Sequence, residues 1–111
     1  MAAGSGHTVA LRVDGTLWAW GDNGWGKLGT GTLARVNTPQ RIGTNATWQA
    51  MAAGWDHTTA LRADGTLWAW GGNYAGQLGN GTSTGANAPQ PIGTNATWQS
   101  VAAGGSHTVA L

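Results

Sequence analysis

The residues Asp14-Gly-Thr-Leu-Trp-Ala-Trp-Gly21 recur without a change as Asp64-Gly-Thr-Leu-Trp-Ala-Trp-Gly71. An Asp-Gly pair between extended segments is a strong signal for a β-hairpin turn. In the second copy the alternation predicts a strand over 66–70, with its two tryptophans on one face and Leu67 and Ala69 on the other. Both faces of this strand are apolar, so the sheet that contains it needs a cover on each side.

The match between these two stretches extends over the whole chain. Residues 1–50 and 51–100 align without a gap and are identical at 34 of 50 positions, and residues 101–111 match 1–11 at 8 of 11. We therefore divide the chain into repeat 1 at 1–50, repeat 2 at 51–100 and a partial repeat 3 at 101–111. A period of this length, interrupted by glycine or proline in nearly every ten-residue window, disfavours helical repeats and favours strands.

Each repeat reads as four short strands. In repeat 2 we expect them at 48–53, 57–62, 66–70 and around 90–92, with a loop of about 17 residues before the last strand. Pro89 and Pro91 suit an edge position because they donate no ladder hydrogen bond. Face-to-face stacking of such sheets, with paired tryptophans in the wedge between them, forms a β-propeller. The predicted fold class is all-β: two full propeller blades of four antiparallel strands and a partial third.

Three ordered elements occur in both full repeats: Ala-Ala-Gly-x-x-His-Thr-x-Ala-Leu, Asp-Gly-Thr-Leu-Trp-Ala-Trp-Gly-x-Asn and Gly-x-Leu-Gly-x-Gly-Thr. With the proline that follows, this pattern resembles the regulator of chromosome condensation repeat, and in its details the bacterial members of that family. The resemblance covers essentially the whole chain and implies a typically seven-bladed propeller. Family members include nucleotide exchange factors, domains of ubiquitin ligases and a β-lactamase inhibitor, so the resemblance implies the fold and leaves the activity open.

Two and a fraction blades do not close a ring. Tryptophans on an uncovered blade face would form an exposed apolar patch. We expect either a segment of a longer protein, of about 350 residues for seven units, or identical chains that meet head to tail. Residues 101–111 duplicate strands that 1–11 already supply, which favours a segment of a larger protein or assembly over a simple two-blade protomer.

Charged side chains are scarce, at 8% of residues, and the net charge is +1. This charge gives no basic footprint for nucleic acid, and no apolar run approaches the roughly 18 residues of a membrane span. Cysteine is absent, which excludes disulfides and thiol chemistry. We therefore expect neither nucleic acid nor a membrane among the partners. The sequence assigns no compartment, and we favour a bacterial extracellular location over a cytoplasmic one.

One histidine recurs in each repeat, at His7, His57 and His107. Zinc needs its ligands within about 2.1 Å of one point, whereas equivalent positions on stacked sheets lie about 10 Å apart. We therefore expect no metal site, and a structural histidine that hydrogen-bonds within its own blade near the glycine turn. The expected blade core consists of the three histidines with Trp18, Trp20, Trp48, Trp68, Trp70 and Trp98.

Other motifs give no site for chemistry. The stretch 24–29 fits the G-x-G-x-x-G pattern, but Thr-Gly-Thr follows it where a nucleotide-binding helix would begin. Asp14 and Asp64 belong to the Asp-Gly turns, one blade apart, and Asp22 and Asp56 each occur in one copy only. No carboxylate pair or catalytic triad results. We expect no catalysis and no cofactor.

Asn45, Asn80 and Asn95 each begin an Asn-x-Thr acceptor pattern for glycosylation. Asparagine is also favoured in turns, and such matches arise easily in a chain rich in Gly, Asn and Thr. We interpret all three as turn residues.

The differences between the repeats indicate where binding is expected. Eleven of the sixteen differences fall within 22–41, and loops on rigid scaffolds commonly carry binding, although neutral drift in a surface loop leaves the same trace. The copy-specific candidates for ligand contact are Trp25, Lys27, Arg35, Trp55 and Tyr74.

The leading hypothesis is a non-enzymatic scaffold that binds a protein partner or copies of itself. One alternative is a sugar-binding module that binds a glycan through Trp25 and Trp55. A second alternative, nucleotide exchange on a small GTPase, is implied by the family resemblance alone.

Overall fold

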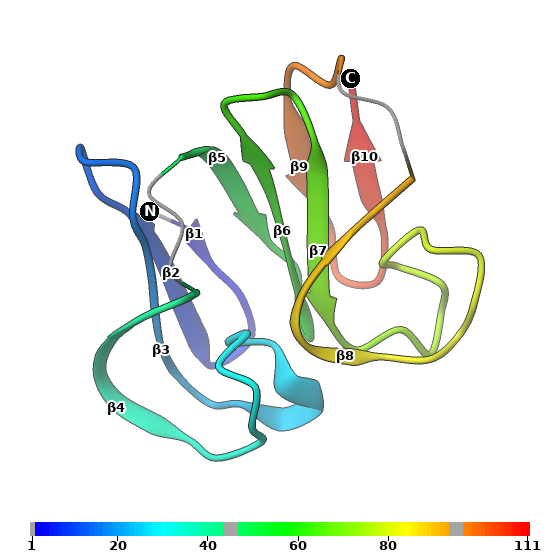
Figure 1. Cartoon of the computed structure of the whole chain (residues 1–111). Coiled ribbons are helices and arrows are strands. Elements are labelled where there is room, and N and C mark those ends of the chain that lie inside the picture. The colour runs from blue at the N-terminus through cyan, green and yellow to red at the C-terminus, as the bar shows by residue number, and fades with distance from the viewer. Residues whose placement is uncertain (1, 44–46, 94–96) are drawn as a thin grey trace.

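The computed structural model describes residues 2–43, 47–93 and 97–111. It contains two four-stranded antiparallel sheets and a two-stranded one, stacked side by side (Figure 1). Blade 1 consists of β1 (Ala2–Ala3), β2 (His7–Leu11), β3 (Leu17–Gly21) and β4 (Val36–Arg41). Blade 2 consists of β5 (Trp48–Ala53), β6 (His57–Arg62), β7 (Leu67–Gly71) and β8 (Ala86–Pro91). Repeat 3 adds β9 (Val101–Ala103) and β10 (Thr108–Ala110).

The all-β class is confirmed. Within the described residues there is no α-helix, only the 3₁₀ turn η1 (Gly24–Gly26), and no helix long and apolar enough to cross a membrane. β5 and β6 match the predicted ranges, and β7 lies one residue later than predicted. β8 begins before the predicted range because a register shift after Ala69 lets Gly71 pair with Ala86. Its prolines lie in the edge strand, as expected.

A side-chain network explains why the Asp-Gly-Thr-x-Trp stretch recurs. The backbone N–H and the hydroxyl of Thr66 donate hydrogen bonds to Asp64 Oδ1, at 3.0 and 2.6 Å. Trp68 Nε1 in turn donates to Thr66 Oγ1 at 2.9 Å. The same three bonds form in blade 1. In both blades these bonds from threonine lower the pKa of the turn aspartate. The turn therefore orients the first tryptophan of the following strand.

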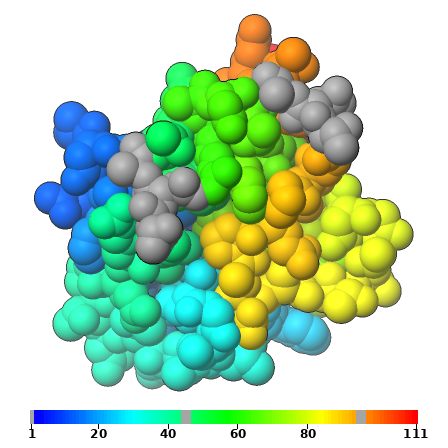
Figure 2. Space-filling model, viewed as in Figure 1, coloured from blue at the N-terminus to red at the C-terminus, as the bar shows by residue number. Residues whose placement is uncertain are grey.

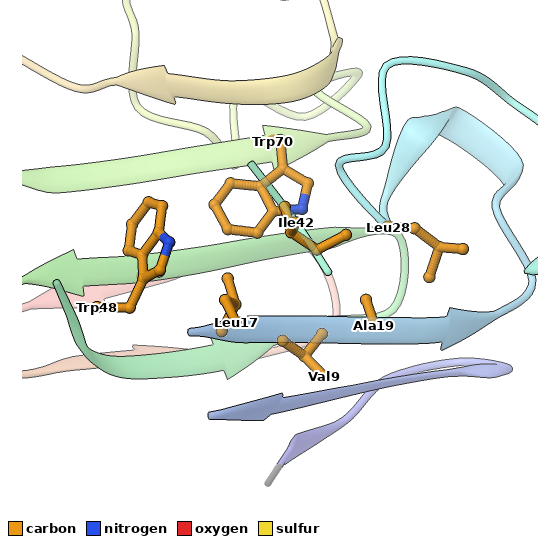
Figure 3. Close-up of a cluster of buried hydrophobic side chains, with 8 residues drawn as sticks. Val9, Leu17, Ala19, Leu28, Ile42, Trp48 and Trp70 are labelled. Atoms are coloured by element: carbon orange, nitrogen blue, oxygen red, sulfur yellow. The ribbon is translucent and has the colours of Figure 1, made fainter. Parts of the chain in front are cut away.

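The two blades meet at a joint between unlike faces, which Figure 3 shows in close-up. The tryptophan face of blade 2 supplies Trp70, which is 0% exposed, and Trp48, which is 4% exposed. Their ring centroids lie 6.0 Å apart in an edge-to-face arrangement. Blade 1 supplies an aliphatic face made of Val9, Leu17, Ala19, Leu28 and Ile42. The predicted filling of the wedge between blades by tryptophan is confirmed at this joint.

The opposite face of blade 2 packs against repeat 3 and against Trp98, which precedes it. Trp98, Val101 and Ala110 contact the buried residues of this face across a second joint. Those buried residues are Leu61, Leu67, Ala69, Leu78 and Ile92. Trp70 and its neighbours Leu67 and Ala69 therefore point to opposite sides of one sheet, as the alternation predicted. Blade 2 is covered on both faces.

Each long loop after the third strand is held by one buried asparagine. Asn73 Oδ1 accepts a hydrogen bond from the backbone N–H of Leu78 at 3.0 Å, and its Nδ2 donates to the carbonyls of Thr82 and Thr84. Asn23 makes the corresponding bonds in blade 1. These bonds hold the loop in one conformation although many of the residues that differ between the two repeats lie in it. In that conformation the loop packs against the neighbouring blade.

The loop of blade 1 contacts blade 2 directly, as the adjoining cyan and yellow-orange surfaces in Figure 2 show. Glycines permit this contact. A Cβ added to Gly26 would lie 2.6 Å from Asn87 Cα, and one added to Gly29 would lie 2.6 Å from Trp70 Nε1. The glycine-rich stretch therefore serves the packing of one blade on the next.

Candidate functional site

One face of blade 1 is not covered by any of the described residues, and we call it the open face. It forms a groove of about 310 Å³ lined by Ala10, Arg12, Trp18, Trp20 and Pro39. Arg12 lies over the ring of Trp18 at 5.4 Å, a cation–π contact. Both tryptophans are half-buried. The open face of blade 1 corresponds to the face of blade 2 that carries Trp68 and Trp70. On blade 2 that face is covered by blade 1.

The covered face of blade 2 shows what a neighbouring blade provides. Arg62 lies over Trp68 at 4.0 Å and over Trp48 at 5.3 Å. Trp70, the counterpart of Trp20, is fully buried. The open face carries the same arginine and tryptophan residues at the corresponding positions of blade 1.

A second candidate surface lies on the loops of both blades. The rings of Trp25 and Tyr74 are 5.1 Å apart and tilted by 48°. Their exposed fractions are 57% and 47%. Trp25 has a left-handed backbone, with φ of 66°, which is uncommon for a non-glycine residue. With Leu33 and the strand β8, Trp25 lines a groove of about 690 Å³. The structure thus brings two of the predicted contact residues together.

Trp55 lies apart from this pair, near the point where the three repeats converge. A hollow of about 400 Å³ is lined by the turns 3–5, 53–55 and 103–105. Trp55 is 63% exposed, and its ring packs over the Cα of Gly105. Arg35 is exposed and lines a different hollow of about 370 Å³ with Trp20 and Asp22.

Lys27 is not at the surface, which corrects its selection as an exposed ligand contact. Its side chain is 2% exposed. Nζ lies 2.7 Å from the carbonyl oxygen of Ser5 and 3.2 Å from that of Trp55. It also pairs with Asp22 at 3.0 Å and Asp56 at 3.3 Å. The lysine is buried because it joins carboxylates and carbonyls of two repeats, and so it is unavailable to a ligand.

Asp22 and Asp56 are the residues that sequence reasoning missed. Each occurs in one copy only, and the structure brings both to Lys27, which also occurs once. The hydrogen bond from Lys27 lowers the pKa of Asp22. Asp56 also accepts a hydrogen bond from the hydroxyl of Tyr74 at 2.8 Å. The sequence offered one signal for this cluster: the two aspartates and the lysine each occur in one repeat only, and their charges are opposite.

The histidines hydrogen-bond between repeats, which differs from the expected bond within one blade. His7 Nε2 lies 3.3 Å from Thr58 Oγ1, and His57 Nε2 lies 2.9 Å from Thr108 Oγ1. Each threonine hydroxyl donates its hydrogen to a backbone carbonyl, so each histidine nitrogen donates to the hydroxyl. Stacking places each histidine beside the threonine that follows the equivalent histidine of the next repeat, so the hydrogen bond crosses the joint between blades.

Burial keeps these two histidines neutral. It lowers the pKa of His7 from 6.5 to about 4, with help from the positive charge of Lys27, and it also lowers the pKa of His57. All three histidine rings pack on the glycine of their own Ala-Ala-Gly turn. His107 is nevertheless exposed, although it was expected in the blade core. Within the described ranges, no group of three potential metal ligands lies close enough to hold an ion.

The remaining motifs fall into turns or outside the described residues. The G-x-G-x-x-G stretch forms η1 and the turn after it. Asn80 Oδ1 accepts hydrogen bonds from the N–H and the hydroxyl of Thr82, and so closes a turn. Asn45 and Asn95 lie outside the described residues.

Comparisons with known proteins place the chain in a family. The sequence model for the regulator of chromosome condensation (RCC1) repeat matches residues 14–61 and 64–111, and a second model of this repeat matches 1–26 and 48–77. The chain is 41% identical over 44 residues to the protein RCC2 homolog of Xenopus laevis. It is 40% identical over 50 residues to the X-linked retinitis pigmentosa GTPase regulator of Homo sapiens. These alignments cover 38% and 43% of this chain, and 9% and 5% of the relatives.

Solved structures agree in fold. Human WBSCR16 superimposes with a TM-score of 0.88 at 26% identity, and yeast RCC1 (Prp20), solved with Kap60, with 0.85 at 27%. Prp20p from Saccharomyces cerevisiae, described with its binding to Gsp1p and histones, gives 0.88 at 24%. Each match covers 98% of this chain, which spans 28–29% of those proteins. Each match of the first family model begins at an Asp-Gly turn and reaches the second strand of the following repeat, so it spans a joint between blades. The chain belongs to the regulator of chromosome condensation (RCC1) repeat family.

Proposed function

We propose that this chain is a non-enzymatic protein-interaction scaffold whose main binding surface is the open face of blade 1. The partner is another blade of the same kind, and a second copy of the chain can supply one. The observation that carries the proposal is the burial of Trp70 on blade 2, at the position that Trp20 occupies on the open face.

The energetic argument is the area of the two tryptophans. A tryptophan side chain buries about 150–250 Å² when covered, and apolar area contributes about 25 cal/mol per Å². Covering Trp18 and Trp20 therefore contributes several kcal/mol before the costs of association. Val9 of blade 1 packs in the first joint. Its counterpart in repeat 3, Val109, is exposed and so is free to pack against another blade. Two copies can thus meet head to tail, in a heterologous contact.

The solution mass of the chain tests this proposal. We expect the 11.3 kDa chain to associate as its concentration rises. The double variant Trp18→Thr and Trp20→Thr removes both rings and keeps residues that favour strands, so it should stay monomeric. Light scattering coupled to size exclusion measures both.

Trp25→Ala is the matched control, because it removes an exposed tryptophan from the loop surface and leaves the open face intact. It should associate as the original chain does. A folded original chain that stays monomeric at every concentration would contradict the proposal, as would a double variant that associates equally well.

The exposed Trp25 and Tyr74 pair supports a second interaction surface. Both residues occur in one repeat only and line or adjoin the groove along β8. Aromatic anchors beside a groove favour an apolar side chain of a protein partner, while stacking on a sugar ring is the alternative. Titration with glycans distinguishes them through the fluorescence of Trp25, with Trp25→Ala as the reference.

Relatives extend the range of protein partners. One relative is named a GTPase regulator, and one structure is described with binding to Gsp1p and histones. A small GTPase is therefore a candidate partner for a propeller that contains these blades. The rate at which a small GTPase exchanges its bound nucleotide, measured with and without the chain, tests exchange activity separately from self-association.

A further inference from the structure

Five residues that differ between the repeats contact one another in a series across the joint. In blade 1 they are Asp22, Trp25 and Lys27, and in blade 2 they are Asp56 and Tyr74. The series runs from the Trp25 ring to Tyr74, from the Tyr74 hydroxyl to Asp56, and from Asp56 through Lys27 to Asp22. Their counterparts one repeat away are uncharged, namely Gly72, Ala75, Gln77, Gly6, Ser106 and Gly24.

The second joint shows the neutral form of the same arrangement. Thr58 Oγ1 donates to the carbonyl of Lys27 and Thr108 Oγ1 donates to the carbonyl of Gln77, both at 2.7 Å. Lysine and glutamine therefore hold the same place at the two joints, and both side chains are buried. At the first joint Lys27 pairs with Asp56 of the following repeat. At the second joint the residue equivalent to Asp56 is the uncharged Ser106.

We propose that these five residues are a neighbour-recognition element that decides which blade can follow blade 1. Tryptophan stacks on aliphatic side chains at both joints, so stacking alone accepts any blade of this type. The charges discriminate, because a buried lysine needs nearby carboxylates. A following blade with serine or glycine in place of Asp56 removes one of the two carboxylates and rejects Lys27.

Denaturant unfolding of the full chain tests the element at the first joint. The isosteric pair Asp22→Asn and Asp56→Asn leaves the buried lysine without a carboxylate, and we expect the folding equilibrium constant to fall at least about 100-fold. Adding Lys27→Gln, the residue of the neutral joint, should restore it to within about tenfold of the original chain. A loss below tenfold in the pair, or a triple variant as unstable as the pair, would overturn the proposal.

Transplanting the lysine to the second joint gives an independent test. Gln77→Lys should lower the folding equilibrium constant by at least about tenfold, and adding Ser106→Asp should recover most of that loss. Gly72 stays unchanged because Tyr74 and Trp25 leave little room for a Cβ there. Additive effects of the two changes would overturn the proposal. These readouts are unfolding equilibria, so they remain informative even if the chain never associates.

Discussion

Replacing Trp70 by alanine is expected to destabilise the chain by about 3–5 kcal/mol, the range typical for removal of a buried tryptophan. Trp70 is 0% exposed and packs between Trp48 and the aliphatic face of blade 1. The loss combines the apolar area of the ring with the cavity left between two rigid sheets. Denaturant unfolding, followed by far-ultraviolet circular dichroism, measures the change in free energy.

Trp20→Ala is the matched control for this prediction, because it makes the same change at the equivalent position of blade 1. Trp20 is half-buried on the open face. At concentrations where the chain is monomeric we expect a loss of about 1 kcal/mol or less. Equal losses for the two variants would mean that the blades do not stack through the tryptophan face of blade 2.

Acid is expected to weaken the chain before Asp14, Asp22 and Asp64 become protonated. The pKa of His7 is about 4 in the folded chain and 6.5 when unperturbed. Because the folded pKa is the lower one, the unfolded chain binds a proton first as the pH falls. The resulting stability is complete above pH 6.5 and is lost between 6.5 and about 4, by roughly 3 kcal/mol for this group.

His57 acts in the same direction, because burial lowers its pKa as well. The pKa values of Asp14, Asp22 and Asp64 lie below 3.8, so their loss of stability comes at lower pH. His7→Gln keeps a donor for Thr58 and removes the titration. Its unfolding free energy should therefore fall less steeply between pH 6.5 and 4. Identical slopes for the variant and the original chain would contradict the neutral, buried state of His7.

Local patterns were sufficient to predict the blades. The Asp-Gly turns, the alternation around Trp68 and Trp70, and the exact period of the repeats each report on residues close in sequence. The start of β8 was placed late, because its pairing with Gly71 follows a register shift that no local pattern indicates. The fold could therefore be predicted from short-range signals. The error in the predicted start of β8 lies where strand pairing is irregular.

Contacts between blades could not be predicted in the same way. His7 bonds Thr58 and Lys27 pairs with Asp56, so each contact joins residues from different repeats. Aligning the repeats compares equivalent positions, whereas stacking brings non-equivalent positions together. Lys27 was therefore assigned to the surface with the rest of its loop. Comparing the single-copy charges by sign, rather than one at a time, would have indicated that they pair.

Oxidative footprinting of the tryptophans, resolved by mass spectrometry of the Trp20 and Trp70 peptides, tests the central claim most directly. That claim is that blades stack tryptophan face to aliphatic face and that blade 1 offers a free tryptophan face. At low concentration we expect Trp20 to react well before Trp70. As the concentration rises Trp20 should become protected, while Trp25, on the loop surface, stays reactive. Equal reactivity of Trp20 and Trp70 at low concentration, or a Trp20 that gains no protection at high concentration, would contradict the account.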